Sequence, residues 1–340
     1  MRAIYSFYFV LISLVSCTHS ESTKINENDK KIQSAKDQDA KKTKFSKQMS
    51  RANSLAMDGL YREALGEYKS ILKQDKNNAL ANKMVGIILV KTGDYKNAIK
   101  RLEKSASQIP SDYEINFYLA EALRTQDRYA DAIFRYKIAL NEKPKSVNTM
   151  KALAWSYYKI RYYKAALETS IELSKKAPKD PQSKIILARV LNKLNKSKKA
   201  LSILKQAAEG APKDQRPYLL SVMGDVLYSM DKKEKAANIY KNALKDQPLL
   251  AGALLGLAKI TLEKGERPDI AITLLERAGR IKPSLVETFF YLGQAHKKTK
   301  PRLSKRYFRK FRKLANGDPE YSEQLSEART MIKKMRRKEM

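Results

Sequence analysis

From Phe45 onward, apolar residues recur every three to four positions, a spacing that predicts amphipathic helices packed through one face. Within this pattern small residues repeat at a fixed interval of 34 positions. One series comprises Ala52, Gly86, Ala120, Ala154 and Ala188. Two further series comprise Ala64, Ala98, Ala132, Ala166 and Ala200, and Pro110, Pro144, Pro178 and Pro212. Three series with one period indicate a tandem repeat of a helical unit.

The small residues predict two antiparallel helices in each repeat. Helices approach closely only where a side chain is small, so the first series is expected on the first helix (helix A) and the second on the second helix (helix B). Proline lacks an amide donor and is expected to end helix B. Large residues at the start and middle of helix B are expected to fill the core: Tyr61, Tyr95, Tyr129 and Tyr163, then Tyr68, Leu102 and Tyr136.

This order of small residue, aromatic residue, alanine and closing proline resembles the tetratricopeptide repeat (TPR) over nearly everything after residue 44. The resemblance implies an all-α fold, a right-handed α-solenoid of about eight helix-turn-helix units with a C-terminal capping helix. The expected array covers 45–318, with units near 45–78, 79–112, 113–146, 147–180, 181–214, 217–250, 251–285 and 286–318. Residues 319–340 are expected to form the basic capping helix, because the end of a solenoid must expose a polar face.

The N-terminus predicts export. After Met1 and Arg2, the apolar run over 3–15 matches a signal-peptide core and is shorter than the ~20 residues of a membrane-spanning helix. It ends in Leu-Val-Ser-Cys17, which resembles the bacterial lipobox and contains the only cysteine. By this resemblance the signal peptide 1–16 is removed and Cys17 is lipidated, which anchors the chain to a membrane. A free thiol beside an ordinary cleavage site is the alternative.

The next segment, 17–44, is expected to be the lipidated Cys and a disordered tether. Residues 18–44 lack aromatic side chains and are mostly polar, so they cannot bury enough apolar surface to fold alone. As a coil they would span roughly 30 Å. Thr18 stands where enterobacterial lipoproteins retained at the inner membrane often carry aspartate, which favours an outer-membrane location facing the periplasm. The chain thus resembles envelope TPR lipoproteins of the pilotin-like or outer-membrane assembly type.

The net charge of +33, from 69 Lys and Arg against 36 Asp and Glu, predicts attraction to acidic proteins or anionic surfaces. Export disfavours nucleic acid as the partner, because a nucleic-acid role requires the chain to stay in the cytosol. No cofactor, metal site or small-molecule substrate is expected. The two histidines, His19 and His296, have no partner at a metal or catalytic-triad spacing, and no phosphate-binding or dinucleotide motif is present. The chain is therefore expected to be a scaffold and not an enzyme.

The TPR resemblance also implies a concave groove that binds a peptide or helix of a protein partner. Four positions of each helix A, the second, fifth, ninth and twelfth, usually point into it. The resulting candidates are Phe117, Glu121, Arg124, Lys151, Trp155, Tyr158, Arg189, Tyr218 and Tyr228. Trp155 either anchors a peptide in the groove or packs against the neighbouring helix A. The Lys and Asn set with which some TPR domains grip a C-terminal carboxylate is missing, because Trp155 follows Lys151 and Ile186 takes a further required place.

A second candidate surface lies near the C-terminus. In 297–313, ten of seventeen residues are Lys or Arg and none is acidic. An apolar stripe is expected at Leu303, Tyr307, Phe311 and Leu314. The cations expected to face outward are Arg302, Lys305, Arg306, Arg309, Lys310 and Lys313. The sequence thus favours a membrane-anchored scaffold for an envelope complex, acting through the groove and this basic patch. The alternative is a basic solenoid that binds an anionic polymer, membrane surface or nucleic acid.

Overall fold

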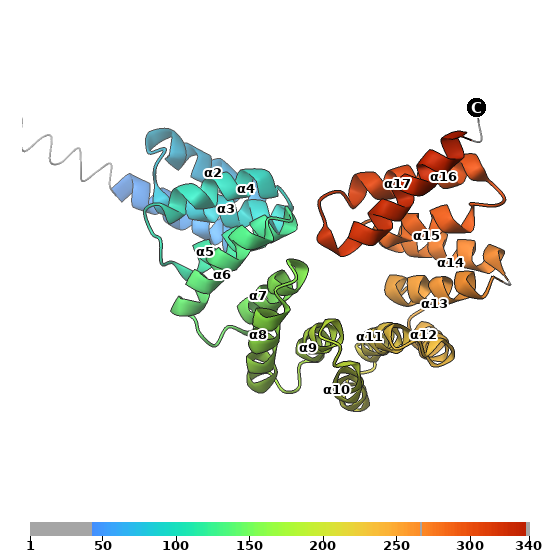
Figure 1. The fold of residues 1–340 in the computed structure, drawn as a ribbon. Coiled ribbons are helices and arrows are strands. Elements are labelled where there is room, and N and C mark those ends of the chain that lie inside the picture. Colours follow the sequence, from blue (N-terminus) through green and yellow to red (C-terminus); the bar gives the residue numbers. More distant parts are fainter. Residues whose placement is uncertain (1–42, 266, 338–340) are drawn as a thin grey trace, which may run out of the picture. The chain divides into compact units, whose positions relative to one another are not determined.

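The computed structural model describes residues 43–265 and 267–337, and within them every regular element is a helix (Figure 1). The helices follow one another as antiparallel pairs, so the expected all-α repeat solenoid is confirmed. The chain divides into two compact units, Met1–Pro110 and Ser111–Met340. Cys17, the signal peptide and most of the tether lie outside the described residues.

The first unit contains two helix pairs in its described part. A helical segment over 43–57 precedes α2 (Tyr61–Gln74), α3 (Ala79–Thr92) and α4 (Tyr95–Ala106). Its core gathers around Tyr68, which is fully buried together with Ala52 and Ala64. The Tyr68 hydroxyl donates to Asn53 at 2.6 Å, so its polar tip is satisfied at the edge of this core.

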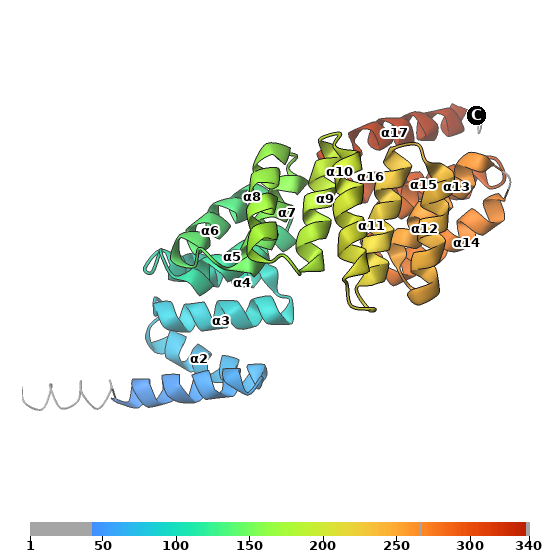
Figure 2. The ribbon, with the colours of Figure 1, turned by 90° about the horizontal axis from the view of Figure 1, so that it is seen from below.

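The described part of the second unit holds six helix pairs and a closing helix. The pairs are α5 (Tyr113–Thr125) with α6 (Tyr129–Glu142), α7 (Val147–Lys159) with α8 (Tyr163–Lys176), α9 (Pro181–Lys193) with α10 (Ser197–Glu209), α11 (Arg216–Ser229) with α12 (Lys233–Asp246), α13 (Ala251–Lys264) with α14 (Pro268–Ile281), and α15 (Glu287–Ala295) with α16 (Pro301–Leu314). A short 3-10 turn, η1 (Pro319–Tyr321), leads into α17 (Ser322–Arg337). Figure 2 shows α7 to α12 standing side by side.

A polar cap begins helix A at the same position of four successive repeats. The side chains of Asn78, Asp112, Ser146 and Asp180 each accept a hydrogen bond from the backbone N–H three residues later. Such a cap satisfies an amide that would otherwise have no partner in the first turn of the helix. The 34-residue period therefore sets where each helix A begins as well as where it packs.

The turn from helix A to helix B also repeats. Gly59, Gly93 and Gly265 have φ of 78°, 87° and 71°, and the equivalent positions in other repeats are Asp127, Arg161, Asn195 and Asp231 with φ between 57° and 65°. The left-handed conformation ends helix A and redirects the chain into helix B. Three of the four residues that are not glycine are Asp or Asn, which tolerate this conformation, so the steric cost falls mainly on Arg161.

Small residues sit where helix A crosses helix B, as expected from the sequence. Ala120, Ala154 and Ala188 are fully buried. At Gly86 and Gly224 there is no room for even a methyl group, because Leu102 and Tyr240 fill the space where a Cβ would stand. The close approach lets helix B bury a large side chain in each pair.

Helix A of each pair in the second unit lies on the inner side of a curve, and helix B lies outside it. Figure 1 shows this for α7, α9 and α11 against α8, α10 and α12. The last pair is covered by α17, whose Leu325, Ala328 and Ile332 are buried against α15 and α16. No helix in residues 43–265 or 267–337 is both long and apolar enough to cross a membrane.

Candidate functional site

The inner side of the second unit encloses a groove with a volume of about 1230 Å³, formed mainly by helix A of successive repeats. All nine groove candidates line it: Phe117, Glu121, Arg124, Lys151, Trp155, Tyr158, Arg189, Tyr218 and Tyr228. The structure thus brings together residues from α5, α7, α9 and α11, which lie apart in the sequence.

Aromatic rings form the N-terminal part of the groove. Trp155 is half-buried and stacks on Tyr158, with ring centroids 5.2 Å apart. Tyr158 is itself buried and packs in the core around Ala154, so Trp155 both lines the groove and packs against the core. Phe117 stacks on Tyr113 at 5.7 Å. These rings offer rigid apolar contact area at little cost in side-chain entropy.

Two charged candidates of α5 are already engaged within the fold. Arg124 donates to Glu121 at 2.7 Å, and the Tyr136 hydroxyl donates to the same carboxylate. Burial alone would lower the pKa of Arg124, but the hydrogen bond and charge of Glu121 raise it above its ordinary value. This trio holds helix A against helix B, and its charges are not free for a ligand.

The charged candidates of α7 and α9 are paired as well. Lys151 lies 3.5 Å from Asp180, which caps α9. Arg189 lies 3.5 Å from Asp225, and Asp225 also accepts a hydrogen bond of 2.8 Å from Tyr240. Each ion pair joins one repeat to the next, so these residues stabilise the stacking of repeats and also present partly exposed charge to the groove.

Lys259 and Glu287 belong to the groove and are absent from the sequence-based candidates. Their charged groups lie 3.8 Å apart, and the Lys259 ammonium sits over the rings of Tyr228 and Tyr291 at 4.9 and 5.2 Å. Burial raises the pKa of the Glu287 carboxyl, and the charge of Lys259 opposes that rise. Lys259 is the ninth residue of the seventh unit and Glu287 is the second residue of the eighth. Both are positions of helix A that usually point into the groove, so the sequence contains the signal for them.

The turn that leads into α17 contacts the C-terminal ends of α7 and α9 at the edge of the groove. We call residues 315–321 the closing turn. Lys159, at the end of α7, lies 3.0 Å from Asp318 and 3.3 Å from Glu320 of this turn. Lys193, at the end of α9, lies 3.6 Å from Glu320. No local pattern in the sequence predicts this contact, because the residues that form it are about 160 positions apart.

Lys159 is held in a strongly anionic environment. Its side chain is only 15% exposed, and its ammonium lies 5.9 Å from the centroid of the Tyr129 ring. Burial alone would lower the pKa of Lys159, but the hydrogen bond to Asp318 and the charge of Glu320 outweigh burial and raise it. The ammonium is therefore charged at neutral pH and held by two carboxylates.

The basic patch on α16 needs one correction to its register. The buried residues are Ser304, Lys305, Phe308 and Phe311, whereas Leu314 is 47% exposed. The predicted stripe is therefore wrong at Leu314 and misses Phe308, whereas Phe311 is buried as expected and Leu303 and Tyr307 are half-buried. The reason lies on α15, where Gly293 leaves space that Phe308 fills and where its carbonyl accepts a 2.6 Å hydrogen bond from Ser304.

The same shift in register moves one cation of the patch inward. Lys305 was expected to face outward and is instead buried, with 9% of its surface exposed. The exposed cations of the helix are Arg302, Arg306, Arg309, Lys310, Arg312 and Lys313. Lys310 places its ammonium 4.0 Å from the centroid of the Phe289 ring. The exposed patch therefore loses Lys305 and includes Arg312 in its place.

Comparison with known proteins assigns the chain to a family. The family described as "Psidin, N-terminal TPR repeats region" matches residues 56–183 and 159–257, which together exceed half of the chain. The chain is a tetratricopeptide-repeat protein. This membership and the groove make it a scaffold for protein–protein interactions, in a family whose members are generally not enzymes.

This TPR protein is similar in sequence to one human protein and in fold to solved TPR structures. The human protein "Anaphase-promoting complex subunit 7" is 24% identical over 168 residues, which cover 49% of this chain and 27% of that protein. A tetratricopeptide repeat protein from Parabacteroides merdae aligns with a TM-score of 0.65 at 14% identity, over 74% of this chain and 98% of that chain. Yeast Tom70 aligns with a TM-score of 0.61 at 17% identity, over 82% and 60%. The chain thus spans about a quarter of the human relative.

Proposed function

We propose that this TPR protein is a lipid-anchored scaffold for the assembly of a bacterial envelope complex, and that its groove holds a segment of a protein partner. The observation that carries the proposal is the groove itself, where aromatic rings and charged side chains from successive repeats line about 1230 Å³ on the inner side of the second unit. Such a surface combines apolar anchors with polar groups that fix the register of a bound segment.

The proposed anchor is Cys17, and the proposed location is the outer membrane facing the periplasm. Support comes from the lipobox-like sequence, the polar tether after it and Thr18 in place of aspartate. Several acyl chains would hold the protein stably, because each buried CH₂ contributes about 0.8 kcal/mol. The comparison with pilotin-like and outer-membrane assembly lipoproteins belongs to this proposal.

Site-specific photocrosslinking in the native envelope tests the groove. A photoreactive amino acid at Tyr218, which lines the groove and is 44% exposed, should crosslink to one discrete protein. The matched control is Phe134 on α6, which is 59% exposed and does not line the groove. Equal crosslinking from both positions, or none from Tyr218, would show that the groove is not the binding surface.

A second candidate surface is the exposed face of α16. In residues 43–265 and 267–337, Arg302, Arg306, Arg309 and Lys313 are exposed and form no ion pair. Unpaired cations on one face attract an acidic partner or an anionic membrane surface. This face supports a second binding contact in addition to the groove. The same exposed cations are also compatible with an anionic polymer or nucleic acid as the ligand.

A further inference from the structure

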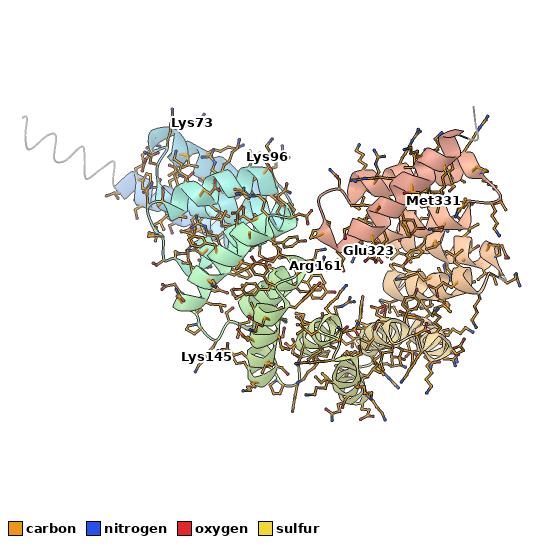
Figure 3. The ribbon with its side chains drawn as sticks, viewed as in Figure 1. Lys73, Lys96, Lys145, Arg161, Glu323 and Met331 are labelled. Atoms are coloured by element: carbon orange, nitrogen blue, oxygen red, sulfur yellow. The ribbon has the colours of Figure 1, made fainter. Side chains whose placement is uncertain are left out.

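The closing turn occupies part of the groove with the chain's own acidic side chains. Its residues Glu320 and Tyr321 line the same groove as Trp155 and Tyr218. Arg161 follows α7 and Glu323 lies in the first turn of α17, and Figure 3 shows them on the two sides of the unit that approach each other here. The turn, which includes η1, thus lies against the ends of α7 and α9.

The lysines that hold this turn differ from the other charges of the groove. The groove acids Glu121, Asp225 and Glu287 each pair with a cation of helix A. In the part of the chain that the structure describes, Lys159 and Lys193 find their carboxylates only in the closing turn. Without the turn, these two ammonium groups would lose the carboxylates that they contact.

The position of the two lysines suits an extended acidic segment. They occupy the same place in successive repeats, 34 residues apart, at the ends of the neighbouring helices α7 and α9. Lys159 follows the stacked pair Trp155 and Tyr158 on α7, so an apolar surface adjoins the charge. An extended chain presents alternate side chains to one surface. Its acidic residues can therefore contact the two lysines while its apolar residues contact the aromatic pair.

We propose that Lys159 and Lys193 bind the acidic side chains of an extended segment of a partner protein, and that the closing turn occupies this site until the partner displaces it. The inference rests on the proposed function of the groove and names the chemistry of its ligand. Carboxylates of the partner take the places of Asp318 and Glu320, with charge-assisted hydrogen bonds to the same ammonium groups. The turn therefore lowers the apparent affinity for partners that carry too few acidic residues to compete.

A synthetic peptide copied from the turn, Ala-Asn-Gly-Asp-Pro-Glu-Tyr-Ser, is the probe. Binding to the full chain is followed by the fluorescence of Trp155, the only tryptophan in the sequence. The double variant Asp318→Asn/Glu320→Gln should bind the peptide about tenfold more tightly than the unchanged chain, which is the gain expected for a turn that occupies the site about nine-tenths of the time. A peptide with Asn and Gln in place of Asp and Glu should not bind.

Removing the lysine should reverse the gain. On the background of the double variant, Lys159→Gln should weaken peptide binding by about tenfold or more, as loss of a charge-assisted hydrogen bond does. The matched control is Lys176→Gln on α8, which removes a charge paired with Glu172 outside the groove. Circular dichroism monitors folding. If the double variant loses helix, Glu320→Gln alone gives the same test, since it leaves the Asp318 cap of η1 in place.

Three results would overturn the inference. Equal peptide affinity with and without the Asp318→Asn/Glu320→Gln change would show that the turn is a fixed part of the fold. A sulfated polysaccharide that binds the double variant as tightly as the peptide would show recognition of charge alone and not of a protein segment. If crosslinking from Tyr218 persists in the Lys159→Gln variant, this inference is wrong but the proposed function of the groove is not affected. If Tyr218 gives no crosslink in the otherwise unchanged protein, the proposed function of the groove is wrong.

Discussion

Gly224 shows how one missing side chain sets the distance between two helices. Its Cβ would overlap the ring of Tyr240, which is fully buried and cannot move away. We expect Gly224→Ala to lower the free energy of unfolding by about 1–3 kcal/mol, the usual cost of overpacking a core. Chemical denaturation followed by circular dichroism measures the change.

Gly66 provides a control, because its replacement by alanine is expected to increase the free energy of unfolding instead of lowering it. It lies inside α2 with open space around the position of a Cβ. Gly66→Ala should therefore raise stability by about 0.5–1 kcal/mol, because alanine loses less backbone entropy in a helix. If both alanine variants shifted stability in the same direction, the assignment of Gly224 to a helix crossing would be wrong.

His296 makes the stability of the last repeat depend on pH. It is buried against Tyr307, and neither ring nitrogen has a hydrogen-bond partner among the described residues. Burial and the charge of Lys300 lower its pKa. Below the ordinary pKa of about 6.5 the unfolded chain takes up a proton that the folded chain resists, so stability is full above this pH and falls as the pH decreases.

The variant His296→Phe tests this dependence. Phenylalanine has a similar size and can still stack on Tyr307, but it cannot bind a proton. Urea unfolding at about pH 7.5 and about pH 5.5, which bracket the ordinary histidine pKa, should show a smaller loss of stability for the variant. A loss of the same size in both proteins would place the pH dependence in other groups.

At the scale of elements, the left-handed turn between helices A and B carries avoidable strain. Arg161 has φ of 65°, while Gly93 makes the same turn in another repeat. Arg161→Gly should raise the free energy of unfolding by up to about 1 kcal/mol, because glycine adopts this conformation without a steric cost. Arg161→Ala keeps the strain and serves as the control. Equal melting temperatures for the two variants would contradict the strain.

The basic patch on α16 predicts a salt-sensitive contact. Replacement of Arg302, Arg306, Arg309 and Lys313 by Gln should weaken binding to an acidic partner or to anionic vesicles and flatten its salt dependence. Exposed charges are screened within about 8 Å at physiological ionic strength, so this contact should weaken as salt rises. Helical content should stay nearly unchanged, because these side chains are exposed.

A control for the patch removes equal charge elsewhere. Lys198, Lys199, Lys205 and Lys241 are exposed on α10 and α12, and their replacement by Gln lowers the net charge by the same amount. If this control weakens binding as much as the α16 variant, net charge and not the patch governs the contact.

Helix pairs were predictable from the sequence because the contacts that form them recur every repeat. A small residue such as Ala154 must face helix B in each unit, so the period reveals the packing directly. The register of α16 was not predictable, since Tyr307 and Phe308 both continue an apolar stripe and only Gly293 on α15 decides between them. The pairing of Lys159 with Asp318 has no local signal, because it depends on the curvature summed over five repeats.

At the scale of the whole molecule, attachment to a membrane is predicted to depend on the sulfur atom of Cys17. Cys17→Ser removes the sulfur that would carry the lipid, and the polar tether offers no apolar anchor in its place. We expect the variant to move from the membrane fraction to the soluble fraction while the helical repeats stay folded. Fractionation with a salt wash measures this, and a serine variant that still sediments with outer membranes would disprove lipid anchoring.

The bridge from Lys159 to Asp318 and Glu320 has a consequence for how the second unit unfolds. In a solenoid each repeat touches only its neighbours, so the terminal repeats fray independently of the middle. Here the turn before α17 is tied to the end of α7, several repeats away along the chain. Fraying of the C-terminal end must break this tie as well, which couples the last repeats to the fourth and makes the intervening repeats more cooperative than a linear array.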